Sequence, residues 1–319
     1  MLSSAVKGRV LGIAGLGASA YRNLEAIGQF DNLPDLAIWT SDKERNSYIA
    51  RLKDLPFKVI EIFEGQREYY RFCQTADCGI FIGNKPYEHY EMLYGAFCYS
   101  ELPILVEKPV VFDPMELENL EALFESSRVQ VACQLNYHPA FQNLAGLAHD
   151  YLFGNISEVK ISLRKNLTPA EWRKDRTKAG GGILMDMMPH YMGVLQLFPE
   201  LWPLILIQSE LVYAEERTET DIELAGQAWF RGRNGALIEF DLSTITDESV
   251  SQFLVVGNQI LVLDFLDPQN WHINGEKQPF CNLRQHLMVN WLNGNKLPVG
   301  LEQGCEHIKL INECYSLCV

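Results

Sequence analysis

The stretch RVLGIAGLGASA, residues 9–20, decides the fold of the first half of the chain. An apolar run leads into two glycines, and apolar residues recur at helical spacing from Tyr21 onward, which is the pattern of strand, glycine turn and helix. In such a unit Gly15 permits a sharp turn, Gly17 lets the backbone approach a pyrophosphate, and Ala20 allows the helix to pack closely on the strand.

This turn predicts a dinucleotide site, with an ordinary strand–helix turn as the alternative. The free N–H groups and the positive dipole end of the following helix would attract phosphates. A glycine pair is a weak motif by itself, and its position between a strand and a helix strengthens it. We expect the cofactor to contact four residues of the turn: Gly15, Gly17, Ala18 and Ser19.

Short apolar runs continue to alternate with helical patterns as far as residue 135. Helical spacing recurs at 90–97 and 113–124, and the predicted strands are 9–14, 36–39, 78–82, 104–106 and 129–135. Strands that alternate with helices form a parallel sheet covered on both faces. Residues 1–135 are therefore predicted to form a doubly wound α/β Rossmann domain that binds the dinucleotide.

The pattern changes in the second half, where tight turns join successive strands. Asn234-Gly235 and Gly257-Asn258 each separate two apolar segments, as the turns of β-hairpins do. Residues 136–319 are therefore predicted to form an α+β domain with an open, mostly antiparallel sheet. We expect it to bind the substrate and, through its sheet, to build a homodimer or homotetramer. Helices are expected at 140–152, after the glycines 180–182, and at 304–317.

Composition and charge narrow the classes of function. The chain has 27 Lys and Arg against 41 Asp and Glu, a formal net charge of −14, which argues against nucleic acid and against an anionic membrane surface as partners. We expect neither a signal peptide nor a membrane span, because no apolar stretch is long enough. The eight cysteines are mostly isolated in apolar patterns, so we interpret them as reduced thiols of a cytoplasmic protein.

The end of the second strand bears on the choice between NAD and NADP. NAD enzymes usually place an acid there to bind the ribose hydroxyls, but Thr40 and Ser41 occupy this place and an acid appears only at Asp42. Together with Lys43, the two hydroxyls could hold the 2′-phosphate of NADP instead. The sequence thus favours NADP over NAD, unless residues 40–43 are only a solvated turn.

Two further groups of residues carry chemistry. Lys108 follows a strand at the carboxyl edge of the predicted sheet, where it can stabilise negative charge on a substrate oxygen. Asp186 and His190 are four residues apart on one helix face, and a carboxylate beside an imidazole suits general acid–base catalysis. We expect this helix to begin near Met185, so that Pro189 falls in its first turn. The alternatives are a surface lysine and a capping aspartate beside an unrelated histidine, and no third ligand suggests a metal.

In this order the segments resemble the glucose–fructose oxidoreductase / myo-inositol dehydrogenase (Gfo/Idh/MocA) family. The resemblance implies an NAD(P)-dependent dehydrogenase or reductase acting on a hydroxyl or ketone of a sugar, cyclitol or nucleotide-linked sugar. It implies Lys108 as the active-site lysine and His190 as the proton-transferring residue with Asp186 as its partner. From the strand end of Lys108 and the helix start of His190, we expect both to act on one substrate oxygen. The resemblance rests on the Gly15 turn, residues 77–82 followed by His89, Glu107-Lys108-Pro109, the glycines 180–182 with Asp186 and His190, and Trp291-Leu292-Asn293-Gly294.

Further binding residues are expected around these groups. We add Asn84, His89, Glu107 and Lys108 to the cofactor site, and Tyr137, Arg173, Asp186 and His190 to the substrate site.

The chain departs from the family pattern close to these residues, which leaves the substrate open. Met188 and Gly193 stand where a glycine and an acid are usual, Asn136 stands in place of an arginine, and Asn84-Lys85-Pro86 replaces a threonine-containing loop. A catalytically silent dinucleotide-binding sensor is therefore one alternative. A reductase of linear tetrapyrroles is another, with an apolar pocket formed by Met187, Met188 and Tyr191.

Overall fold

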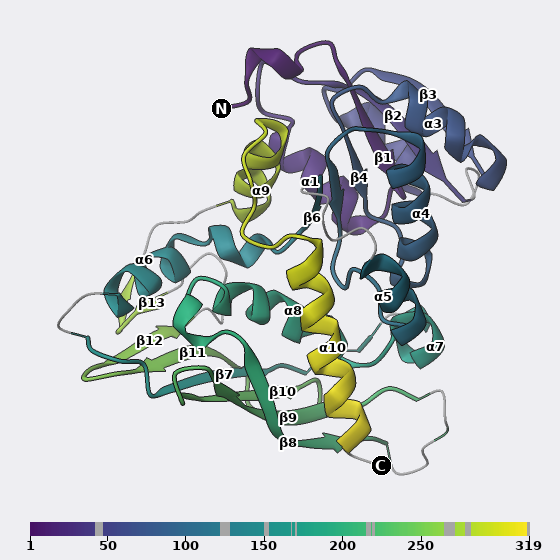
Figure 1. Cartoon of the computed structure of the whole chain (residues 1–319). Coiled ribbons are helices and arrows are strands. Elements are labelled where there is room, and N and C mark those ends of the chain that lie inside the picture. The colour runs from purple at the N-terminus through teal and green to yellow at the C-terminus, as the bar shows by residue number, and fades with distance from the viewer. Residues whose placement is uncertain are drawn as a thin grey trace. The chain divides into compact units, whose positions relative to one another are not determined.

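The computed structural model describes residues 1–41, 47–121, 128–149, 153–166, 168–169, 171–214, 218, 221–264, 272–277 and 282–317. The chain divides into two compact units. The first consists of Met1–Gln134 and Asn282–Gly304, and the second of Leu135–Cys281 and Cys305–Val319. Figure 1 labels the elements of each unit.

Six parallel strands form the sheet of the first unit, in the order β3-β2-β1-β4-β5-β6. The central strand β1 pairs with β2 on one side and with β4 on the other, so the strand order reverses beside the glycine turn that follows β1. Ligands of open parallel sheets bind at such a reversal, outside the carboxyl ends of the strands. The strands are β1 (Val10–Ala14), β2 (Asp35–Thr40), β3 (Val59–Glu64), β4 (Gly79–Ile82), β5 (Ile104–Val106) and β6 (Val129–Val131).

Helices cover both faces of this sheet, and the predicted Rossmann architecture is confirmed. Figure 1 shows α1 and α9 on one side of the sheet and α3 and α4 on the other. The helices are α1 (Ala18–Ile27), α2 (Ser47–Arg51), α3 (Tyr69–Thr75), α4 (Pro86–Tyr99), α5 (Pro114–Glu121) and α9 (Leu283–Leu292), with 3-10 turns at Ser4–Val6, Leu52–Asp54 and Gln66–Glu68.

Two details of this sheet differ from the sequence prediction. The edge strand β3 was missed, because Phe63 is its one buried side chain and its apolar pattern is correspondingly weak. The strand predicted over 129–135 ends at Val131. There the main chain makes a tight turn, in which Cys133 N donates to Val131 O at 2.9 Å, and a 3-10 turn (Gln134–Tyr137) follows.

The segment Asn282–Gly304 lies with the first unit, although it follows the second unit's strands in sequence. Its helix α9 packs against α1, and Trp291 lies against Gly79 at the start of β4. Farther along, Val131 N donates to Val299 O at 3.0 Å, which attaches the segment beside β6. The contacts thus divide the chain differently from the ranges 1–135 and 136–319, which stay a prediction about its domains.

Eight strands form the sheet of the second unit, in the order β14-β13-β12-β11-β7-β10-β9-β8. Only β7 and β10 run parallel; the other neighbours are antiparallel, and both predicted hairpins are present as β9–β10 and β11–β12. The predicted sheet type is therefore confirmed. The strands are β7 (Glu158–Arg164), β8 (Leu204–Val212), β9 (Ala225–Gly232), β10 (Leu237–Ser243), β11 (Val250–Val256), β12 (Ile260–Asp264), β13 (His272–Ile273) and β14 (Glu276–Lys277).

Helices pack on the inner face of this sheet, where Phe230, Phe240 and Phe253 are fully buried. Phe253 meets Phe141 of α6 edge to face, with ring centroids 5.1 Å apart. The helical elements are α6 (Pro139–Ala148), α7 (Arg176–Ala179), α8 (Ile183–Leu195) and α10 (Leu301–Leu317, continuing from the first unit), with 3-10 turns at Glu171–Lys174 and Pro199–Leu201.

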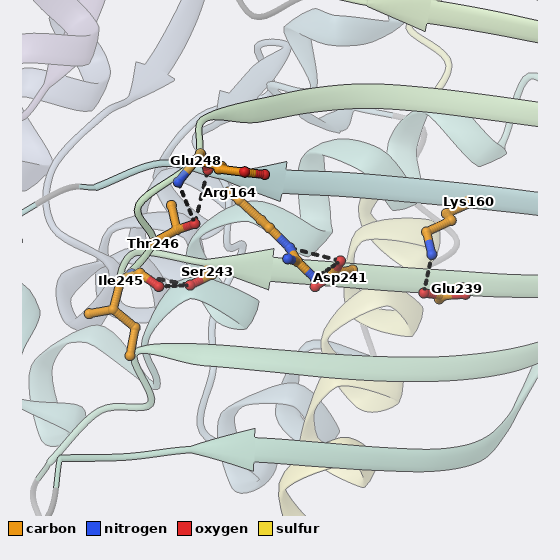
Figure 2. Close-up of polar contacts among 8 residues, drawn as sticks. All are labelled: Lys160, Arg164, Glu239, Asp241, Ser243, Ile245, Thr246 and Glu248. Carbon is orange, nitrogen blue, oxygen red and sulfur yellow. Dashed lines mark hydrogen bonds and ion pairs between the residues drawn. The ribbon is translucent and has the colours of Figure 1, made fainter.

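The outer face of the second unit's sheet carries a charged ladder, drawn in Figure 2. Lys160 Nζ lies 2.7 Å from Glu239 Oε1, and Arg164 donates to Asp241 Oδ2 through Nε at 3.0 Å and Nη2 at 2.6 Å. Apolar side chains on the same face stay exposed, because alternate residues of each strand point away from the core. The most exposed of these within the strands are Ile205 at 65%, Ile260 at 59% and Val212 at 49%.

The prediction for the start of α8 is wrong. The helix begins at Ile183, so Pro189 lies in its interior and not in its first turn. A proline there has no N–H to donate to the carbonyl of Met185, which removes one helical hydrogen bond. The helix nevertheless continues to Leu195, because most of its side chains are buried and tertiary packing stabilises it.

Candidate active site

The glycine turn after β1 has the geometry of a phosphate-binding turn. Gly15 has a φ of 82°, and a Cβ on it would lie 2.3 Å from the Cβ of Asn84, so only glycine fits. Gly17 is different. Its φ of −96° suits any residue, and the nearest atom to a Cβ there would be Gly83 O at 3.6 Å. The fold thus requires Gly15 but leaves room at Gly17, as expected where a ligand needs the space.

The N-terminus of α1 is open. Gly17 is its N-cap and has no side chain to cap the helix, and the first helical bond runs from Tyr21 N to Gly17 O at 2.9 Å. The N–H groups of Ala18, Ser19 and Ala20 therefore have no partner inside the helix. Such a helix end, with its positive dipole, fits an anion of the size of a pyrophosphate.

The loop after β4 contributes Asn84 beside this turn, and the first part of α4 contributes His89. Asn84 Nδ2 donates to Glu88 Oε2 at 3.1 Å, whereas the buried Asn84 Oδ1 accepts no hydrogen bond within the described part of the chain. The wholly buried His89 has Nδ1 2.7 Å from Pro109 O and Nε2 3.1 Å from Asn84 O. Burial lowers the pKa of His89. His89 thus ties the loop of Asn84 to the residue that follows Lys108.

Glu107 and Lys108 follow the last residue of β5 at the same edge of the sheet. Ser19 Oγ donates to Glu107 Oε1, so this carboxylate, which is 7% exposed, lies against the first turn of α1. Lys108 is half-buried, and the Lys108–Pro109 peptide bond is cis. Burial raises the pKa of the neighbouring Cys133 thiol to about 12, against the influence of the Lys108 charge. The first unit therefore gathers most of the predicted cofactor residues.

The residues predicted to choose between NAD and NADP are only partly described. Thr40 is the last residue of β2 and is buried, and the exposed Ser41 follows it. Asp42 and Lys43 lie outside the described residues.

In the second unit, α8 carries the predicted acid–base residues. Asp186 stands in the first turn and pairs with Arg173, with 2.9 Å between Oδ2 and Nη1. Because the side chains of Arg173 and Asp186 are 46% and 34% exposed, this ion pair adds at most about 1 kcal/mol to stability. Its main effect is to orient the Asp186 carboxylate. His190 lies one turn later and is 8% exposed. Two predicted substrate residues, Arg173 and Asp186, are thus in contact.

The glycine run before α8 is explained by two neighbours that sequence analysis missed, Glu223 and Tyr315. A Cβ on Gly181 would lie 2.0 Å from Tyr315 Oη, and one on Gly182 would lie 1.9 Å from Glu223 O. Gly180 has a φ of 78° at the end of α7. The three glycines therefore let the chain pass these neighbours.

Glu223 caps the start of α8 from a distant part of the chain. Its carboxylate accepts hydrogen bonds from Gly182 N at 2.7 Å, Leu184 N at 2.9 Å and Tyr315 Oη at 2.9 Å. Burial raises the pKa of Glu223, and these hydrogen bonds oppose the rise. The one available sequence signal was an acid between the apolar Ile222 and Leu224 directly ahead of a strand.

Two departures from the family pattern turn out to be neighbours. The wholly buried Asn136 donates through Nδ2 to Gly193 O of α8 at 2.9 Å. Where the usual pattern has an arginine and an acid, this chain has an amide and a main-chain carbonyl. Tyr137, a predicted substrate residue, follows directly and is half-buried. The changed pair therefore connects the 3-10 turn that contains Tyr137 to α8.

Among the described residues, no three His, Cys, Asp or Glu side chains gather as metal ligands would. Within that same part of the chain, no helix is long and apolar enough to cross a membrane.

Together the two units define a Rossmann-type protein with a second unit built on an open mixed sheet. Residues 141–262 match the family model of the GFO/IDH/MocA C-terminal domain, which confirms the family resemblance seen in the sequence. The search among curated protein sequences gave no match to this chain.

Solved structures share the fold at low sequence identity. The WlbA dehydrogenase from Bordetella pertussis, in complex with NADH and UDP-GlcNAcA, is 16% identical with a TM-score of 0.77, over 97% of this chain and 96% of its own. The aldose-aldose oxidoreductase from Caulobacter crescentus, complexed with glycerol, is 16% identical with a TM-score of 0.80, over 98% and 97%. A variant of the 3-ketoreductase KijD10 from Actinomadura kijaniata, in complex with TDP-benzene and NADP, is 16% identical with a TM-score of 0.76, over 98% of both chains.

The capping role of Glu223 predicts a large loss of stability in Glu223→Ala. The change leaves two buried N–H groups and the Tyr315 hydroxyl without their acceptor, at about 1–3 kcal/mol for each such group. We expect the free energy of unfolding in urea to fall by about 3 kcal/mol or more. Glu210→Ala on the exposed part of β8 is the control and should change it by less than about 0.5 kcal/mol. Equal stability of the two variants would contradict the capping role.

Proposed function

We propose that this protein is an NAD(P)-dependent oxidoreductase that transfers a hydride between the nicotinamide and a hydroxyl or ketone carbon. The observation that carries the proposal is the open N-terminus of α1 behind Gly17, where the fold has room for a side chain and the sequence has none. The orphaned acceptor Asn84 Oδ1 beside the same turn fits a ligand as well. The fold neighbours crystallised with NADH and NADP support the proposal.

The proposed substrate is a sugar, a cyclitol or a nucleotide-linked sugar. This choice follows from the family resemblance and from the UDP- and TDP-linked ligands named for two of the fold neighbours. The proposed substrate contacts are Tyr137, Arg173, Asp186 and His190.

The chemistry divides between residues with different tasks. The bound nicotinamide supplies or accepts the hydride. Lys108 stabilises negative charge that develops on the substrate oxygen, and His190 gives or takes the hydroxyl proton. Asp186, held by Arg173, supports the charged form of the imidazole one turn away.

The other two readings of the sequence receive less support. A silent dinucleotide sensor would have no need of Lys108, Asp186 and His190 together, and turnover with a panel of ketoses separates it from an enzyme. A tetrapyrrole reductase needs a wide apolar pocket, but of the three side chains suggested for it Met188 and Tyr191 are 0% and 1% exposed, and only Met187 is half-buried. The burial of Met188 and Tyr191 disfavours them as a pocket lining.

Self-association through the outer face of the second unit's sheet is also proposed. Exposed apolar residues flank the ladder of Figure 2, whose charges are already neutralised in pairs within one chain. A second copy of the same face could cover them without leaving unpaired charge. We expect Ile205→Lys to shift the protein to monomers in sedimentation velocity. Met115→Lys, at an exposed apolar position of the first unit, should not; a wild-type monomer would refute the proposal.

Gly17→Val is predicted to abolish dinucleotide binding without unfolding the protein. The extended backbone at Gly17 accepts valine, and the added side chain fills the space above the open helix end. Calorimetry should find no binding of NADP or NAD at concentrations that saturate the wild type. Gly15→Ala is the contrasting variant. It should lower the melting temperature, because its Cβ meets Asn84 and its φ is positive. Unchanged cofactor affinity in Gly17→Val would count against the site.

NADP is predicted to bind more tightly than NAD. Thr40 ends β2 and Ser41 follows it, and neither of them is the carboxylate that NAD enzymes usually place at this strand end, where it would oppose a 2′-phosphate. Dissociation constants from titration of the tryptophan fluorescence test this order. Ser41→Asp should weaken NADP binding and spare NAD. A wild-type preference for NAD would show the prediction to be wrong.

His190→Ala is predicted to lower turnover by about 10²–10⁴-fold, the usual contribution of a general acid–base group. Lys108→Ala should also lower turnover, by loss of charge stabilisation. Cofactor affinity should change little in His190→Ala, and the limb of the pH–rate profile that reports the imidazole should disappear. His149→Ala, at an exposed histidine of the same unit, is the control. An active His190→Ala enzyme with a normal pH profile would exclude this role.

A further inference from the structure

Arg284 of α9 reaches the first turn of α1, although 265 residues separate it from Ser19. Its Nη1 donates to Ser19 Oγ at 3.0 Å, to Asn23 Oδ1 at 2.8 Å and, more weakly, to Ser19 O at 3.5 Å. The same atom lies 3.9 Å from Glu107 Oε1. An arginine from the end of the chain thus stands beside the turn that the Rossmann motif offers to phosphate.

The negative charge of Glu107 at the N-terminus of α1 has to be offset by a cation if an anion is to bind there. The Glu107 carboxylate, at 7% exposure, is held against Ser19 and would repel an anion bound at the same helix end. The glycine turn itself, residues 15–20, contains no lysine or arginine. Arg284 therefore supplies positive charge where the carboxylate would otherwise oppose a phosphate.

The guanidinium also has donors to spare. It carries five N–H groups in a planar fork, and within the described residues only Nη1 has acceptors. The side chain is 23% exposed, so Nε and Nη2 are not sealed in the core. A planar fork with free donors is the usual partner of phosphate oxygens. Nearby, the buried Asn23 Nδ2 has no acceptor in the described part of the chain either.

We infer that Arg284 is a binding residue of the dinucleotide site and that its guanidinium contacts the cofactor's pyrophosphate. This inference rests on the proposed function and adds to it a residue outside the glycine motif. Besides packing against α1, helix α9 then positions Arg284 so that its side chain contacts α1. The segment Asn282–Gly304 is in this sense part of the cofactor site.

The test measures binding by calorimetry with NADP, NAD and ADP, the last carrying a pyrophosphate without nicotinamide. Arg284→Gln should weaken all three by about 10- to 100-fold, as expected for loss of a charge-assisted hydrogen bond. Arg284→Lys keeps the positive charge but lacks the planar guanidinium, so its affinities should lie between those of the wild type and those of Arg284→Gln. If Arg284→Gln does not fold, Arg284→Lys provides the same test of binding.

Arg128→Gln is the matched control. Arg128 has a side-chain exposure of 22% and donates to Ser100 O at 2.6 Å. It directly precedes β6 and so lies at the amino ends of the parallel strands, whereas the glycine turn lies at their carboxyl ends. Its loss should leave the three affinities unchanged.

The outcomes separate this inference from the proposed function. Wild-type affinity in Arg284→Gln would overturn the role of Arg284 and leave the dinucleotide site intact. A loss that disappears in the Glu107→Gln background would also overturn it, because Arg284 would then only neutralise Glu107. A wild-type protein that binds none of the three ligands would refute the proposed function itself.

Discussion

In each unit a glutamate carboxylate lies against the N-terminus of a helix that carries predicted site residues, α1 in the first and α8 in the second, and the way it is held decides what that helix can do. In the second unit Glu223 accepts the main-chain N–H groups of Gly182 and Leu184, so the start of α8 is already occupied by negative charge. In the first unit Glu107 is bound through the side chain of Ser19, and the main-chain N–H groups of α1 are left over. Of these two helices, α1 is therefore the one whose end can receive an external anion.

The two glycine motifs consequently have different physical meanings. Gly15 and Gly182 are required by packing, because a Cβ on either would collide with a neighbouring part of the chain. At Gly17 the nearest atom to an added Cβ would be Gly83 O at 3.6 Å, an ordinary van der Waals contact, so packing does not require a glycine there. A glycine that the fold does not need is better evidence for a ligand than one that it does. The proposed cofactor site rests on Gly17 for this reason, and the glycines before α8 are better explained by the capping of that helix.

The sequence predicts the features that depend on local pattern and misses those that depend on distant contacts. Alternating apolar runs gave both sheet types, and the glycine turn gave the position of α1. The start of α8 was misplaced because Pro189 suggested a first turn, whereas burial of the helix outweighs the one missing hydrogen bond. Glu223 and Arg284 were missed because their partners lie 41 and 265 residues away, where no spacing rule applies.

Because the chain carries a net negative charge, positive groups close to the proposed cofactor site contribute strongly to the binding of an anionic cofactor. A protein of net charge −14 repels an anionic cofactor at long range, and in physiological salt this repulsion is screened beyond about 8 Å. Contacts within that distance then determine affinity, and they include the unfavourable charge of Glu107. The open helix end contributes roughly half a unit of positive charge, too little to offset the carboxylate of Glu107. With the full positive charge of Arg284, 3.9 Å from that carboxylate, the net charge that faces a bound phosphate becomes positive.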